Sequence, residues 1–142
     1  MVEDVLVKVA GVFMANTPET PGPVVFLESE QKRVLPIYIG VSEAFSIQTA
    51  IDNTPYPRPL THDLFINVLE NLGLQIERIV IDDISEGVFF SRLIIARNGD
   101  RVEFDARPSD CIALAVRTNA PVFVSQKVME KASVEKGEYE LE

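Results

Sequence analysis

Strand-like segments occur in two groups of three along this chain, and helix-like segments follow each group. Runs rich in β-branched residues are separated by short turn signals within each group. The strongest of these signals is Asn98-Gly99, because a type I′ hairpin needs two residues that tolerate positive φ. Connections this short join antiparallel strands, so each group predicts a three-stranded meander. The predicted strands cover residues 5–14, 24–28 and 34–39 in the first group, and 74–81, 88–96 and 102–105 in the second.

The segments between and after the meanders have helical signals. Apolar residues recur at helical spacing after Ser42 and again after Thr61, and both hydroxyls are common helix caps. Three prolines within residues 55–59 exclude a regular element between these two helices. The remaining boundaries are Gly73 at the end of the second helix, Pro108 and Asn119 at the two ends of a third, and a short last strand at 121–125.

This order of elements predicts an α+β fold in a single domain, with a mostly antiparallel sheet built from two three-stranded meanders and three to four helices. The domain is expected to cover residues 1–130. Residues 131–142 are rich in Glu and Lys and are expected to form a charged C-terminal tail, either a frayed helix or disordered. A chain of 142 residues can bury a sizeable core without disulfides.

The charge balance limits how this chain can bind other molecules. Thirteen Lys and Arg stand against 22 Asp and Glu, a formal net charge of −9. Bulk electrostatic attraction to a phosphate backbone is therefore excluded, and any contact with nucleic acid needs a bridging divalent cation or a local arginine patch. A single cysteine and an acidic N-terminus favour a cytoplasmic protein, and the apolar run at residues 5–14 is too short for a membrane span.

Two short segments share one pattern: an arginine before a proline, then a hydroxyl, then an aspartate at the start of a helix. The two arginines are Arg58 and Arg107. Each is presented from a stiff turn beside a helix N-terminus, where anions are favoured, so both are candidate phosphate ligands. A structural interpretation stays open, in which Asp63, Asp110 and Glu43 cap helices and the two arginines hold those acids in place.

His62 is the only histidine and therefore the only side chain whose ordinary pKa suits a proton shuttle near neutral pH. A surface or capping role is the alternative. Cys111 is flanked by apolar residues and is expected to be a buried, unreactive thiol. Hard oxygen ligands for Mg²⁺ or Mn²⁺ are available if four acids converge, although their spacing matches no known metal motif. These acids are Glu43, Asp63, Asp105 and Asp110.

Taken together, four motifs make the sequence resemble the bifunctional nuclease domain family, in order and spacing, from about residue 5 to residue 128. The motifs are Pro36-Ile37-Tyr38-Ile39-Gly40, Glu43-Ala44, Arg58-Pro59-Leu60-Thr61-His62-Asp63-Leu64 and Asp105-Ala106-Arg107-Pro108-Ser109-Asp110. Some members of that family are described as cleaving both DNA and RNA. The resemblance therefore implies metal-assisted phosphodiester hydrolysis and a homo-oligomer, with a dimer favoured.

Two hypotheses follow. The first is a metal-dependent nuclease of low sequence specificity that acts on DNA, RNA or both. The second is a non-catalytic module that binds an anionic small ligand or a protein partner. In the first hypothesis the catalytic residues are His62, Asp63 and Glu43, the phosphate-binding residues are Arg58, Arg107 and Ser109, and the ligands of Mg²⁺ or Mn²⁺ are Asp63, Asp105 and Asp110.

Overall fold

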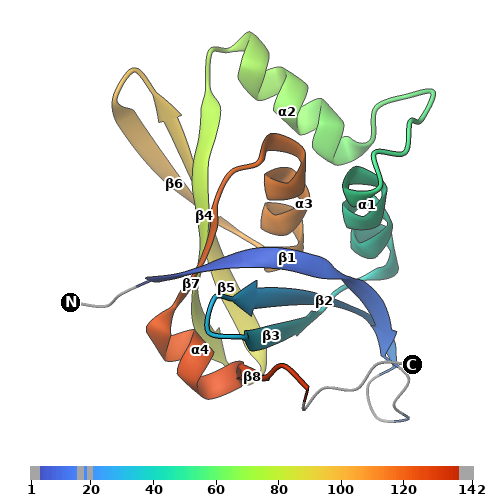
Figure 1. Cartoon of the computed structure of the whole chain (residues 1–142). Helices are drawn as coiled ribbons and strands as arrows, with labels where there is room; N and C mark the ends of the chain where they lie inside the picture. The colour runs from blue at the N-terminus through green and yellow to red at the C-terminus, as the bar shows by residue number, and fades with distance from the viewer. Residues whose placement is uncertain (1–3, 16–17, 19–20, 138–142) are drawn as a thin grey trace.

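The computed structural model describes residues 4–15, 18 and 21–137, and it confirms a single α+β domain (Figure 1). Both predicted meanders are present and antiparallel. The first consists of β1 (Asp4–Ala15), β2 (Gly22–Ser29) and β3 (Arg33–Tyr38). The second consists of β4 (Gln75–Ser85), β5 (Val88–Arg97) and β6 (Asp100–Ala106).

One eight-stranded sheet contains both meanders, in the order β6-β5-β4-β7-β1-β2-β3-β8. The strand that joins them is β7 (Val122–Ser125), which runs antiparallel to β1 and parallel to β4. Sequence analysis predicted this strand but not its position between the meanders. Its central place explains why Val122 and Val124 are buried.

The turns of the second meander follow local backbone chemistry. Asn98 and Gly99 have φ values of 49° and 89°, as the predicted two-residue hairpin requires. Glu86 and Gly87 take the same conformation at the other turn, with φ values of 52° and 79°.

Three helices cover one region of the sheet: α1 (Val41–Ile51), α2 (Thr61–Asn71) and α3 (Pro108–Thr118). In Figure 1, α3 packs against the sheet while α1 and α2 lie against α3. The core between them is aliphatic, with Ile47, Ile79 and Ile112 fully buried. The fourth helix, α4 (Gln126–Ala132), lies at the opposite end of the view and contacts β1, β3, β4 and β7.

Two helix caps differ from the prediction. Gly40, not Ser42, is the N-cap of α1, and Leu60, not Thr61, is the N-cap of α2. The reason at α2 is that the Asp63 carboxylate accepts a hydrogen bond from the Leu60 amide at 2.9 Å, which satisfies the helix terminus without a hydroxyl. The predicted ends of α3 are confirmed, with Pro108 in its first turn and Asn119 left-handed at φ 61°.

Residues 131–137, expected to fray or be disordered, instead complete α4 and form the short strand β8 (Val134–Glu135) beside β3. Two buried residues of α4, Val128 and Met129, anchor this end of the chain, and Ser125 caps the helix. Burial of the apolar face of α4 thus keeps this segment ordered, although its charged composition had predicted fraying or disorder. The rest of the expected tail, residues 138–142, lies outside the described residues. Across the described part of the chain, no helix has the length and apolar character needed to cross a membrane.

Candidate active site

The first turns of α1, α2 and α3 meet, and each carries an acid at its third position. These acids are Glu43, Asp63 and Asp110. An acid in the first turn is favoured by the helix dipole, which explains the recurring position. Because the three N-termini converge, side chains from distant parts of the sequence come within hydrogen-bond distance of one another.

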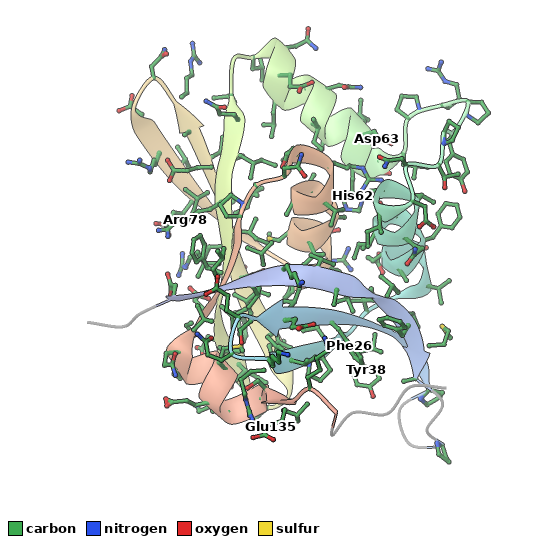
Figure 2. All side chains as sticks on the ribbon, viewed as in Figure 1. Phe26, Tyr38, His62, Asp63, Arg78 and Glu135 are labelled. Atoms are coloured by element: carbon green, nitrogen blue, oxygen red, sulfur yellow. The ribbon has the colours of Figure 1, made fainter. Side chains whose placement is uncertain are left out.

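The His62 ring bridges α1 and α3. Its Nδ1 lies 2.6 Å from Ser46 Oγ, and its Nε2 lies 2.9 Å from Asp110 Oδ1. The His62 side chain is 14% exposed and Ser46 is 5% exposed, so water competes little for these contacts. Figure 2 shows His62 and Asp63 side by side at the start of α2, close to α1 and α3.

Asp110 fixes the proton positions on this ring. Partial burial raises the pKa of its carboxyl, but hydrogen bonds from Arg107 and His62 outweigh that effect and leave the pKa below its ordinary value. The carboxylate is therefore ionised at neutral pH and can only accept, so Nε2 carries a proton. In the neutral ring, Nδ1 then accepts from the Ser46 hydroxyl. Both ring nitrogens are engaged within the protein.

Arg107 presents its guanidinium to solvent from this cluster. Its Nε donates to Asp110 Oδ2 at 2.9 Å, and its Nη2 lies 3.2 Å from Asp110 Oδ1 and 3.4 Å from Glu43 Oε2. The Arg107 side chain is 65% exposed although its guanidinium contacts both Asp110 and Glu43. The hydrogen bond with Asp110 raises the pKa of Arg107. The cluster has two carboxylates for one guanidinium and is thus locally negative.

Gly40 leaves room for Glu43. A Cβ atom built on Gly40 would collide with Glu43 Oε1. The glycine at the end of the Pro36-Ile37-Tyr38-Ile39-Gly40 motif thus favours this position of the carboxylate but is not required by the fold, because the flexible end of the Glu43 side chain can move aside and the Gly40 φ of −76° is open to any residue. It allows the Glu43 carboxylate to fold back over the start of α1, within reach of Arg107.

Asp63 belongs to a separate cluster. Its carboxylate accepts from Arg117 Nε at 2.7 Å and from the Leu60 amide. Burial raises the pKa of the Asp63 carboxyl, but these two hydrogen bonds outweigh that effect and leave the pKa below its ordinary value. Arg58 lines the same neighbouring cavity of about 670 Å³ as Asp63 and Arg117. The residues predicted as one site therefore form two clusters. His62 belongs to the cluster with Asp110 and Arg107, and Asp63 belongs to the cluster with Arg117.

Asp105 and Ser109 do not join the His62 cluster. Asp105 on β6 lies opposite Arg92 on β5 in the strand register. Its side chain therefore projects from the opposite face of the sheet to that of its neighbour Phe104. Ser109 is buried in the first turn of α3. The three acids predicted as metal ligands thus face three environments. Within the described residues, no group of three or more His, Cys, Asp or Glu side chains is arranged to hold a metal ion.

Two residues of these clusters were missed by sequence analysis, Ser46 and Arg117. Spacing was the available signal: Ser46 lies on the same helical face as Glu43, and Arg117 lies two turns after Asp110. Cys111 is fully buried beside Ser91, as predicted, and burial raises the pKa of its thiol to about 11.

A groove of about 980 Å³ extends from this cluster between α2 and the β5–β6 hairpin. His62, Arg107 and Asp110 contribute to its lining, and most of the remaining wall is apolar. A second cavity of about 520 Å³ opens over the same three residues from the side of α1, where Ser46 lines it.

The fold and site thus define an α+β domain in which an exposed arginine and paired acids meet at converging helix N-termini. The family model for the bifunctional nuclease domain matches residues 24–137, and the chain therefore belongs to that family. This confirms the resemblance drawn from its motifs.

The chain is also similar to individual proteins. The chain is 36% identical over 128 residues to "Uncharacterized protein Rv1829" of Mycobacterium tuberculosis, covering 90% of this chain and 76% of the relative. It is 27% identical over 119 residues to "Bifunctional nuclease 2" of Oryza sativa subsp. japonica, covering 80% and 37%. Identity to "Bifunctional nuclease 2" of Arabidopsis thaliana is 26% over 96 residues, covering 66% and 29%. The chain thus spans about a third of each of these plant relatives.

Proposed function

We propose that this protein is a nuclease that hydrolyses phosphodiester bonds of nucleic acid at the Glu43–His62–Arg107–Asp110 cluster. One observation supports this above the others: Arg107 is exposed, yet its guanidinium is fixed by two carboxylates at the mouth of two cavities. The Arg107 Nε and Nη2 contact the carboxylates, so Nη1 is the nitrogen positioned to donate to a phosphate oxygen. Family membership supplies the type of reaction.

The residues of the cluster would divide the work as follows. Arg107 binds a non-bridging phosphate oxygen and stabilises the charge that develops there. Asp110 orients Arg107, accepts a proton from the attacking water as the new P–O bond forms, and returns that proton to the leaving oxygen as the scissile P–O bond breaks. His62 does not carry this proton, because its Nε2 already donates one to Asp110 and its Nδ1 is engaged by Ser46; the ring holds Asp110 in position.

Mg²⁺ or Mn²⁺ belongs to this proposal as well. The acids that suit such a cation are Glu43 and Asp110, which share Arg107 and leave the cluster negative. Mg²⁺ is commonly held by one or two carboxylates with the remaining positions taken by water and substrate phosphate. When bound there, a divalent cation would offset the negative charge that otherwise opposes the approach of a phosphate.

Arg58 and Asp63 have a different place in this proposal. The ion pair between Asp63 and Arg117 joins the start of α2 to α3 and so helps to position the neighbouring His62. Arg58, exposed in the adjacent cavity, is proposed to contact a neighbouring phosphate. Sequence specificity would be low, because phosphate contacts carry no sequence information.

A non-catalytic module that binds an anionic ligand or a protein partner is the second candidate. The observation that favours it is that His62, Asp63 and Asp110 all have protein partners, as structural clasps do. In that case phosphate would stabilise the protein without any metal, through the mass action of binding to the native state.

Cleavage of single- and double-stranded DNA and RNA tests the proposal. The purified protein is assayed with Mg²⁺, Mn²⁺ or EDTA beside Asp110→Asn. The matched control is Asp82→Asn, because Asp82 is also a partly exposed acid paired with an arginine, Arg92, but it lies outside the cluster. We expect metal-dependent cleavage that Asp110→Asn abolishes and Asp82→Asn retains. Equal cleavage by all three proteins reveals a contaminant. Absence of cleavage combined with stabilisation by phosphate supports the second candidate.

We also propose a homo-oligomer, with a dimer favoured, in the cytoplasm. The outer side of α2 exposes Leu64, Val68 and Leu72, and such apolar stripes are commonly covered by a partner. Light scattering of the wild type and of Val68→Glu tests the assembly: a dimer that becomes a monomer supports it, and a monomeric wild type contradicts it.

A further inference from the structure

The groove between α2 and the β5–β6 hairpin has aromatic side chains on both walls. Phe65 projects from α2, and Phe104 projects from β6. They are 39% and 48% exposed. Figure 1 shows α2 and this hairpin at the same end of the molecule. Two exposed phenyl rings in one concave site form a surface on which a flat ligand can stack.

The position of the groove relates it to the cluster described above. Its lining includes His62 and Arg107 beside the first turn of α2, and it reaches Arg97, Asn98 and Asp100 at the hairpin turn. A ligand whose phosphate lies at Arg107 would therefore extend its next group between the two phenyl rings. The volume of about 980 Å³ falls in the range of small-ligand sites.

Charge indicates what that group is. The groove has no excess of positive charge: Arg97 and Arg107 are matched by Asp100 and Asp110, and the side chain of Asp105 lies on the other face of the sheet. The groove therefore cannot follow a phosphate backbone by electrostatics. Affinity must come from a flat, uncharged group that stacks on aromatic rings. In a nucleic acid that group is the base, and it is accessible only where the strand is unpaired.

We propose that this groove holds an unpaired nucleobase of a single-stranded nucleic acid whose phosphate lies at Arg107. The inference rests on the proposed nuclease function and adds a substrate class to it, single strands rather than duplexes. Phe65 and Phe104 stack against the base, whose faces are open to such stacking only where the strand is unpaired.

Binding of a short fluorescent single-stranded DNA oligonucleotide is the test, measured by anisotropy with Ca²⁺ in place of Mg²⁺ or Mn²⁺, so that a divalent cation is present to offset the negative charge of the cluster. The intactness of the oligonucleotide is checked afterwards. The same sequence with abasic residues and the same sequence as a duplex are compared. The variants are Phe65→Leu and Phe104→Leu, which stay apolar but lose the ring. Phe90→Leu is the matched control, because Phe90 is 43% exposed on the opposite face of β5. Thermal melting verifies that each variant folds.

We expect abasic DNA and both groove variants to bind about 5- to 100-fold more weakly, the loss typical of one stacked base. Phe90→Leu should remain within about twofold of wild type, and the salt dependence should correspond to roughly one or two phosphate contacts. Equal binding of abasic DNA, or of duplex, would overturn the inference. The inference would also be overturned if Phe65→Leu and Phe104→Leu changed the oligomeric state but not the binding of DNA, since a second copy of the chain would then fill the groove.

Cleavage is scored separately. If the protein cleaves nucleic acid but binds intact and abasic DNA equally well, the groove inference is overturned and the nuclease function stands. Base-dependent binding without cleavage supports the groove and overturns the nuclease.

Discussion

Ser46 and His62 are joined by a hydrogen bond of 2.6 Å between Ser46 Oγ and His62 Nδ1, which ties α1 to α2 beneath the exposed Arg107. The serine is buried, and its hydroxyl donates to Nδ1, the ring nitrogen that Asp110 leaves without a proton. The only histidine of the chain is thereby oriented from one side by a hydroxyl and from the other by Asp110.

Replacing Ser46 with alanine is expected to destabilise the fold by about 1–3 kcal/mol, because it leaves a buried ring nitrogen without its partner. Nuclease activity should fall as well, since the ring is free to turn. Urea unfolding and cleavage assays measure the two effects. Ser42→Ala, an exposed serine of the same helix, should change stability by less than about 0.5 kcal/mol. Equal behaviour of the two variants would remove Ser46 from the cluster.

Arg107→Lys is expected to lower the cleavage rate by about 100-fold, because an ammonium cannot contact two carboxylates and a phosphate in one plane. The folded structure should persist, since the side chain is largely exposed. Arg92→Lys, which alters an exposed ion pair with Asp82 on another face, serves as the control. A lysine variant that cleaves at the wild-type rate would show that the fork geometry has no role.

Asp63→Asn separates structure from catalysis. Arg117 is 9% exposed, and the substitution removes the charge that compensates its guanidinium. We expect a loss of stability of about 1–2 kcal/mol, reduced from the value of a fully buried pair because Asp63 is partly exposed. The folded protein should keep its cleavage rate within about threefold. If activity disappears at unchanged stability, Asp63 has a catalytic or metal-binding role, as the sequence had predicted.

Acid is expected to destabilise the protein through Asp63 and Asp110. The folded pKa of each lies below its unfolded value, so each contributes stability that is fully present above the unfolded pKa of about 3.9 and is lost as the pH falls through the folded pKa. Urea unfolding between pH 7 and pH 2.5 measures this. Asp63→Asn and Asp110→Asn should each flatten the acid side of the curve. Parallel curves for wild type and variants would contradict the assigned ion pairs.

Cys111 should be inert in the native protein. Its sulfur is fully buried and burial raises the pKa of the thiol to about 11, so almost no thiolate exists near neutral pH. Iodoacetamide labelling followed by mass spectrometry should show no reaction in buffer and complete reaction in denaturant. Rapid labelling of the folded protein would indicate an accessible thiolate and a different packing of α3.

Local signals predicted much of the fold correctly. Asn98-Gly99, Pro108 and Asn119 mark boundaries because their effect on the backbone depends on few neighbours. The caps at Ser42 and Thr61 were wrong for a related reason: several groups can satisfy a helix terminus, and at α2 the Asp63 carboxylate does so instead of a hydroxyl. The end of α4 was also misjudged, because burial of Val128 and Met129 is a tertiary effect.

The sequence by itself determined the α+β class, the two meanders, the family and the short segments that carry the candidate site. Only the tertiary structure decided how that site is divided. His62 and Asp63 are adjacent in the chain, but successive helical residues point about 100° apart, so one joins Asp110 and the other joins Arg117. Which partner each side chain meets depends on how α1, α2 and α3 pack and on the long-range pairing of β7 between the meanders. Residue spacing along the chain encodes neither the helix packing nor the strand order.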